Sequence, residues 1–147
     1  MRLSEVLAEK GSDVVTARND ESVGAAIQKL VAHNIGALAI VDAANRLVGI
    51  FSERDILRLI SNTPEALAGF RISDHMTRNV ITASLEDNVD ESQARMFSNR
   101  IRHLPVLNQN GNLIGMISMG DLVKARLDQV EFENNHLEGI VSGKYPA

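Results

Sequence analysis

The chain contains the same segment twice. The string LVGIFSERDI at residues 47–56 returns as LIGMISMGDL at residues 113–122, an offset of 66 residues (115 − 49). The offset holds without a gap from residue 14 to residue 57, with identical residues at Thr16/Thr82, Val23/Val89, Ile35/Ile101, Leu38/Leu104, Gly49/Gly115, Ser52/Ser118 and Asp55/Asp121. An ungapped repeat of this length is a supersecondary unit, so the fold is predicted to consist of two similar units.

Length and composition favour one compact module. The chain has 147 residues, which is the length of a single domain. A unit of roughly 66 residues forms only a marginal core by itself, so the two units are predicted to bury their apolar faces against each other. A net charge of −4 and only five aromatic residues (four Phe, one Tyr) argue against a nucleic-acid-binding surface.

The sequence lacks the signatures of several other protein classes. It has no cysteine, which excludes disulfides and zinc–thiolate sites. It has neither an apolar run of membrane-spanning length nor a signal peptide, so we expect no membrane association and a cytoplasmic location. The four histidines are scattered, and no catalytic or phosphate-loop motif occurs, so we expect no enzymatic activity and no metal site.

Hydrophobic periodicity predicts the same order of elements in each copy: strand, helix, strand, strand, helix. The predicted strands are 14–16, 37–41, 47–51, 80–82, 103–107 and 113–117, and the predicted helices are 2–9, 23–33, 52–60, 89–100 and 119–138, with a helix start at 63–66. Residues 72–76 resemble residues 3–7 at an offset of 69 (72 − 3). We therefore divide the chain into a first unit with its N-terminal helix and linker (1–70), a second unit (71–130), and a helix end and tail (131–147).

The strings GIFSERD (49–55) and GMISMGD (115–121), each after a helix and a hairpin, resemble a stand-alone tandem CBS-domain protein, a family named after cystathionine beta-synthase. The resemblance extends from about Leu3 to Leu127. It implies an α/β (α+β) fold in which two β-α-β-β-α CBS repeats, related by a pseudo-twofold axis, pack as one compact module.

The same resemblance implies a function. Clefts between the two sheets of such modules bind adenosine-containing ligands such as AMP, ADP, ATP, NAD(H) or S-adenosylmethionine, and two modules usually pair into a disc-like homodimer. The family senses a metabolite or the energy state, usually performs no chemistry of its own, and regulates a target protein that this sequence does not identify.

Two Ser-x-x-Asp strings are the main candidate sites. Ser52 with Asp55, and Ser118 with Asp121, can form a capping-box-like helix start, in which the acid also favours the positive helix end. The same carboxylates can bind both hydroxyls of a ribose, beside helix N–H groups that suit a phosphate. Both interpretations are compatible with the sequence.

Basic residues distinguish the two copies. Arg102 and His103 precede a strand and are either solvated or, as the resemblance implies, directed at a phosphate. Their counterparts in the first copy are Gly36 and Ala37, so that site needs another cation, for which Arg54 is the candidate. The two sites are therefore predicted to differ in affinity or in ligand.

The other candidate positions have an ordinary structural role as their alternative. Thr16 and Thr82 fit strands by propensity but are often ligand contacts in the family. Val80, Ile101 and Met116 suit either an adenine or the core. Lys10 is more often solvated than bound to phosphate. The basic patch of Arg95, Arg100 and Arg102 is usually a solvated helix face. The residues predicted to bind ligand are Thr16, Ala37, Ser52, Arg54, Asp55, Thr82, Ile101, Arg102, His103, Pro105, Met116, Ser118 and Asp121.

Three functions remain in comparison: a dimeric adenosine-ligand sensor, a weak nucleotidase or hydrolase, and a dimerisation or interaction subunit that has lost its ligand. The Asp121→Asn substitution separates the first from the third. A sensor loses ligand affinity, whereas a pure capping role changes stability by only about 0.5–1 kcal/mol.

Overall fold

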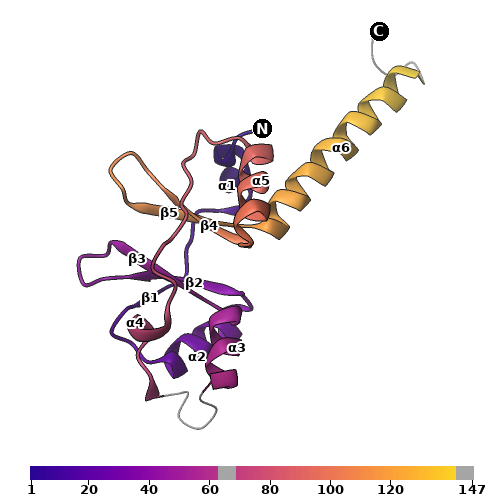
Figure 1. The fold of residues 1–147 in the computed structure, drawn as a ribbon. Helices are drawn as coiled ribbons and strands as arrows, with labels where there is room; N and C mark the ends of the chain where they lie inside the picture. Colours follow the sequence, from indigo (N-terminus) through magenta and orange to yellow (C-terminus); the bar gives the residue numbers. More distant parts are fainter. Residues whose placement is uncertain (63–68, 142–147) are drawn as a thin grey trace.

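Two small sheets, one from each repeat, form the middle of the molecule, and most helices lie on their outer sides (Figure 1). The computed structural model describes residues 1–62 and 69–141. The helices are α1 (Leu3–Lys10), α2 (Val23–His33), α3 (Glu53–Asn62), α4 (Ile72–His75), α5 (Val89–Asn99) and α6 (Met119–Val141). The strands are β1 (Thr16–Arg18), β2 (Ala37–Val41), β3 (Leu47–Ser52), β4 (His103–Leu107) and β5 (Leu113–Ser118).

The first repeat forms a three-stranded sheet with the order β1-β2-β3. Strand β2 pairs in parallel with β1 and antiparallel with β3, and all five of its residues are buried. This burial explains why β2 is a continuous apolar run rather than an alternating one. Helix α2 connects β1 to β2: the Ser22 side chain accepts a hydrogen bond from the Ala25 N–H (3.1 Å) at its start, and Asn34 adopts a left-handed conformation at its end.

The first strand of each repeat differs from the prediction. In the first repeat β1 begins at Thr16, because pairing with β2 starts where Thr16 lies opposite Ala39. In the second repeat the strand predicted at residues 80–82 is wrong: only Ala83 forms an isolated parallel bridge, to Val106. This bridge has the same register as the β1-β2 pairing of the first repeat, but it involves a single residue pair. The sheet of the second repeat therefore contains only the two strands β4 and β5 among the described residues. Val14, Val15 and Val80 favour a strand by intrinsic propensity. The ends of the strands are set instead by where the neighbouring strand offers hydrogen-bonding partners.

The two repeats exchange their leading segments. Leu3 and Leu7 of α1 are buried in the core of the second repeat, whereas Ile72 and Met76 of the second leading segment are buried in the core of the first. The chain therefore crosses between the repeats at each leading segment. This exchange gives two cores that each depend on both parts of the chain.

The glycine of each repeated motif lies where an exchanged segment packs on the sheet. A Cβ atom on Gly49 would approach the Met76 sulfur to 2.5 Å and the Thr77 carbonyl oxygen to 2.9 Å. A Cβ atom on Gly115 would approach Leu7 Cδ1 to 2.7 Å. Glycine is thus required here for close packing, and the repeated Gly marks the exchange at the level of the sequence.

The linker between the repeats and the C-terminal end of the chain differ from the rest in how far the predictions can be compared with the structure. The helix start predicted at 63–66, and the tail from residue 142, fall outside the described residues. Helix α6 extends three residues beyond the predicted end at 138. Across residues 1–62 and 69–141, no helix is long and apolar enough to span a membrane, and no cluster of metal-ligating side chains occurs.

Candidate functional site

Each Ser-x-x-Asp motif forms the start of a helix by hydrogen bonds within the motif. The Ser52 N–H donates to Asp55 Oδ2 (2.8 Å), and the Ser118 N–H donates to Asp121 Oδ2 at the same distance. The Asp121 N–H donates to Ser118 Oγ (3.1 Å). Both motifs are therefore helix caps, and any binding role depends on what else surrounds each carboxylate.

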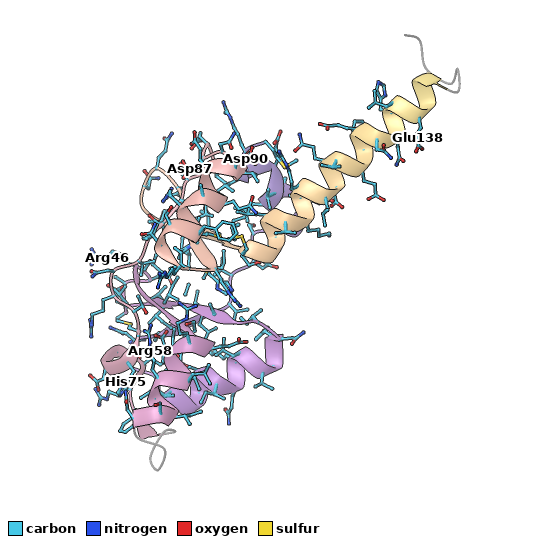
Figure 2. All side chains as sticks on the ribbon, turned by 45° about the vertical axis from the view of Figure 1, so that its right-hand side comes forward. Arg46, Arg58, His75, Asp87, Asp90 and Glu138 are labelled. Carbon is cyan, nitrogen blue, oxygen red and sulfur yellow. The ribbon has the colours of Figure 1, made fainter. Side chains whose placement is uncertain are left out.

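The Asp55 carboxylate is already enclosed. It is 5% exposed, and its Oδ2 accepts hydrogen bonds from both the N–H and the hydroxyl of Ser52. Its Oδ1 accepts one from the Thr77 hydroxyl (3.3 Å), and Arg58 Nη1 lies 3.7 Å from the same oxygen. Figure 2 labels Arg58 on the lower part of the molecule, on α3. Both oxygens of Asp55 are thus engaged by groups of its own chain.

The Asp121 carboxylate is more open, with a side chain 24% exposed. Lys10 Nζ donates to its Oδ2 (2.6 Å) and to the Met116 carbonyl (2.6 Å). Burial raises the pKa of Asp121, but the hydrogen bonds from Lys10 and Ser118 outweigh burial and hold this pKa below its ordinary value. No described residue donates a hydrogen bond to Oδ1 of Asp121. The group is thus an anion with one oxygen available to a hydroxyl.

Lys10 remains partly exposed, with a side chain 35% accessible, but it also forms this ion pair, which the sequence did not indicate. Lys10 is the last residue of α1, and its partner lies 111 residues further along the chain. The contact exists because α1 packs on the second repeat rather than on its own. Identical motifs therefore have different partners: a lysine for Asp121 and a threonine for Asp55.

A cavity of about 720 Å³ lies next to the second motif. Its volume is in the range of small-molecule sites. It is lined by Arg54 from α3, by the end of α5 and the residues that follow it (Met96, Phe97, Arg100, Ile101, Arg102 and His103), and by Ser118, Met119 and Gly120. Both repeats contribute to its wall.

Three arginines give the cavity its charge. None of Arg54, Arg100 and Arg102 forms an ion pair with a carboxylate among the described residues. Arg54 Nη1 donates to the Arg100 carbonyl (3.0 Å), which connects the two repeats. Arg100 adopts a left-handed conformation (φ 54°) at the end of α5, a position where glycine is usual and a side chain is strained. Guanidinium groups without carboxylate partners suit a phosphate.

His103 lies at the boundary between the repeats. Burial lowers the pKa of His103, and the Lys10 ammonium lowers it further, while the carboxylates of Asp121 and Glu53 oppose the shift. A Cβ atom on Gly36 would lie 3.5 Å from His103 Cε1, so His103 lies against the junction before β2 in the first copy. The imidazole is neutral at pH 7 and can either donate or accept a hydrogen bond.

The sequence pattern of the CBS domain matches residues 4–62 and, a second time, residues 72–128. The chain belongs to the CBS-domain family. It is 33% identical over 151 aligned residues to the CBS domain-containing protein CBSX3, mitochondrial, of Arabidopsis thaliana, an alignment that covers 97% of this chain and 73% of the relative.

Solved CBS structures share the fold. The CBS-domain containing protein ATU1752 from Agrobacterium tumefaciens superposes with a TM-score of 0.82 at 40% identity, covering 85% of this chain and 92% of that one. The CBS domain protein PAE2072 from Pyrobaculum aerophilum, complexed with AMP, gives 0.78 at 27% identity, covering 91% and 99%. The CBS domain pair of MJ0100, in complex with 5′-methylthioadenosine and S-adenosyl-L-methionine, gives 0.78 at 28% identity, covering 88% and 98%. Adenosine is the chemical group that these bound ligands share.

The structure divides the predicted binding residues into three groups. Five of them line the cavity: Arg54, Ile101, Arg102, His103 and Ser118. Asp121 and the Met116 carbonyl meet at the Lys10 ammonium beside it. The remainder lie outside the cavity lining: Ser52 and Asp55 form the first cap, Ala37 and Pro105 are buried in strands, and the Thr16 and Thr82 carbonyls accept hydrogen bonds from Lys29 and Arg95.

Five cavity residues were not among the predicted binding residues: Met96, Phe97, Arg100, Met119 and Gly120. Arg100 had one usable signal. Helix α2 of the first repeat is followed by Asn34, a residue type that tolerates the left-handed conformation. The equivalent helix of the second repeat, α5, is followed by Arg100. A strained arginine that departs from the repeat indicates a role beyond helix termination.

Proposed function

We propose that this CBS pair is a regulatory module that binds one adenosine-containing ligand, such as AMP, ATP or NAD(H), and performs no chemistry of its own. The ribose hydroxyls bind the available oxygen of Asp121, and the phosphates enter the cavity lined by Arg54, Arg100 and Arg102. The observation that carries the proposal is an accessible anion, Asp121, directly after Gly120 of the cavity lining. The three arginines of that cavity form no ion pair with a carboxylate in the part of the chain that the structure describes. The relatives with bound AMP, methylthioadenosine and S-adenosylmethionine support the ligand class.

Each chain binds one ligand, at the second repeat. A ribose cannot reach Asp55 without displacing Ser52 or Thr77, because this carboxylate is buried and both of its oxygens are engaged. The first repeat also has Gly36 and Ala37 where the second has a cation and an imidazole. The second site therefore offers both the ribose acceptor and most of the positive charge.

Lys10 gives the site a route to a conformational response. A ribose hydroxyl that donates to Oδ1 of Asp121 shares this carboxylate with the Lys10 ammonium on Oδ2, and so weakens the contact that Lys10 makes. Lys10 is the last residue of α1. Ligand binding then alters how the end of α1 is held on the second repeat. A ligand shifts such an equilibrium only through its different affinities for the two states. A target protein that contacts α1 could respond to this change.

We also propose that the module is a homodimer. Exposed apolar side chains recur at equivalent positions of the two repeats: Val31 and Phe97 (76% and 70% exposed) and Leu57 and Val123 (66% and 42% exposed). Apolar groups at matching positions suit a face shared with a second, symmetric copy. If no adenosine ligand binds, this face supports the alternative function of a dimerisation or interaction subunit.

Thermal unfolding with AMP, ADP, ATP, NAD, NADH and S-adenosylmethionine tests the function. A ligand at about 100 times its dissociation constant stabilises by about 2.7 kcal/mol, which is a shift of roughly 5–10 °C for a chain of this size. We expect a clear shift with one or two of these compounds, abolished by Asp121→Asn and retained in the matched control Asp55→Asn. Equal unfolding temperatures with all six compounds would leave the interaction subunit as the function, and magnesium-dependent turnover of a bound nucleotide would contradict the absence of chemistry.

A further inference from the structure

Helix α6 continues well beyond the body of the molecule. It contains 23 residues, a length of roughly 34 Å. Figure 1 shows its second half extending away from both repeats, and Figure 2 places Glu138 near its far end. All side chains from Val130 to Glu138 are exposed. The outer half of α6 is therefore not packed against the body of its own chain.

One face of α6 carries an exposed stripe at the spacing of a coiled coil. Val123, Leu127, Val130 and Leu137 are 42%, 62%, 52% and 60% exposed, and Asn134 completes the series. Their separations are four, three, four and three residues, which is the 3.5-residue repeat of two helices that supercoil. We call these five residues the α6 stripe.

The α6 stripe does not face the body of the molecule. Leu122 is fully buried and Ala125 packs against the core of the second repeat, so these two define the inward side of the helix. At 100° per residue, the stripe lies more than a quarter turn away from that side. It is therefore available along its whole length to a second helix.

We propose that the α6 helices of two copies of this chain pair in parallel along the stripe as a short coiled coil. Asn134 falls at a core position, where a single asparagine favours a parallel, in-register pair at some cost in stability. Arg126 and Glu131 flank the stripe on opposite sides, five residues apart, which is the spacing that places opposite charges across a parallel pair. This inference rests on the proposed homodimer and adds its orientation.

The flanking charges also limit the choice of occupant. Glu131, Glu133 and Glu138 make the exposed half of the helix acidic, which disfavours an anionic membrane surface. Arg126 lies 3.4 Å from Asp90 of its own chain in an exposed pair, so it can exchange that partner for the Glu131 side chain of a second copy. Glu133 and Glu138 meet as like charges further along, which keeps the coil weak and dependent on the rest of the dimer.

Parallel pairing has a consequence for the sites. It places the second repeats of the two copies side by side at the base of the coil. The two copies of the Asp121 site then lie on the same side of the dimer. An arrangement with the copies reversed would separate them and leave each α6 without a partner.

Disulfide trapping tests the pairing directly, because the chain contains no cysteine. Val130→Cys and Leu137→Cys are made as two separate single variants of the full chain, with Asn135→Cys on the opposite face as the matched control. Facing core positions of a parallel pair are within the Cα separation that a disulfide spans, which is about 4.4–6.8 Å. We expect both stripe variants to form covalent dimers under mild oxidation and the control to form few.

Reversed helices would allow self-linking only at their crossing point, so linking at both positions requires a parallel pair. Sedimentation of the unmodified chain distinguishes a wrong coiled coil from a wrong homodimer. A dimer whose stripe variants link no better than Asn135→Cys overturns the coil and leaves the proposed homodimer intact. A monomer overturns both. A Leu137→Asp variant is expected to weaken dimerisation while the ligand-induced thermal shift is unchanged.

Discussion

Replacing the glycine of each repeated motif by alanine tests the exchange of leading segments quantitatively. In Gly49→Ala the new Cβ meets the Met76 sulfur at 2.5 Å and the Thr77 carbonyl oxygen at 2.9 Å. The thioether can rotate away, but the carbonyl cannot, because Thr77 and Ile50 exchange two backbone hydrogen bonds of 2.8 and 2.9 Å. Overpacking of this kind destabilises by about 1–3 kcal/mol.

Two further variants, Gly115→Ala and Gly120→Ala, give smaller expected changes with which the loss in Gly49→Ala can be compared. In Gly115→Ala the contact is only with side-chain carbons of Leu7, the nearest at 2.7 Å, so the loss is expected to be smaller. In Gly120→Ala the nearest atom is Ser118 Oγ at 3.6 Å, and alanine at a helical position adds up to about 1 kcal/mol of stability. From most to least stable, the expected order is therefore Gly120→Ala, Gly115→Ala and Gly49→Ala.

Urea unfolding of the three variants measures this order. The midpoints should differ while the dependence of the unfolding free energy on urea stays constant, because the folds are the same. Each kcal/mol corresponds to roughly 2–4 °C in thermal unfolding for a chain of this size. A Gly49→Ala protein as stable as the unmodified chain, or no more destabilised than Gly120→Ala, would refute the packing of the exchanged segment on this strand.

Three further outcomes are expected. Arg100→Gly relieves the left-handed strain and stabilises by up to about 1 kcal/mol, yet weakens binding of a phosphorylated ligand, whereas Asn34→Gly leaves binding unchanged in calorimetry. Because the pKa of His103 is lowered in the folded state, the unfolded chain binds more protons than the folded chain as pH falls below 6.5. The free energy of unfolding measured in urea therefore declines as pH falls, and His103→Gln removes this pH dependence. Thr77→Val removes one donor to Asp55, costs about 1 kcal/mol in the same assay, and leaves ligand affinity unaltered.

The repeat made most of the fold predictable. Equivalent elements recur because the 66-residue offset applies to whole helices and strands, and the match of residues 72–76 to residues 3–7 marked the leading segments as part of the repeat. Which core each segment joins was not predictable, because it depends on a contact between a glycine and a residue 27 positions away (76 − 49). The offset of 69 shows that residues 72–76 and 3–7 are equivalent, but it does not show which core each segment packs into.

The difference between the two sites was only partly predictable. Sequence showed unequal cations around two identical Ser-x-x-Asp motifs. It did not show that Thr77 encloses Asp55 while Lys10 pairs with Asp121, because both partners come from exchanged segments. Arg100 looked like part of a solvated helix face until its backbone conformation placed it at the cavity.

Calorimetric titration with AMP tests the central claim of one adenosine ligand per chain, bound at Asp121. We expect a single site per chain in the unmodified protein and an unchanged affinity in Asp55→Asn. In Asp121→Asn we expect the affinity to fall roughly 10- to 100-fold, since a charged hydrogen bond contributes about 1.5–3 kcal/mol. Two equal sites per chain, or an affinity that survives Asp121→Asn and falls in Asp55→Asn, would contradict it.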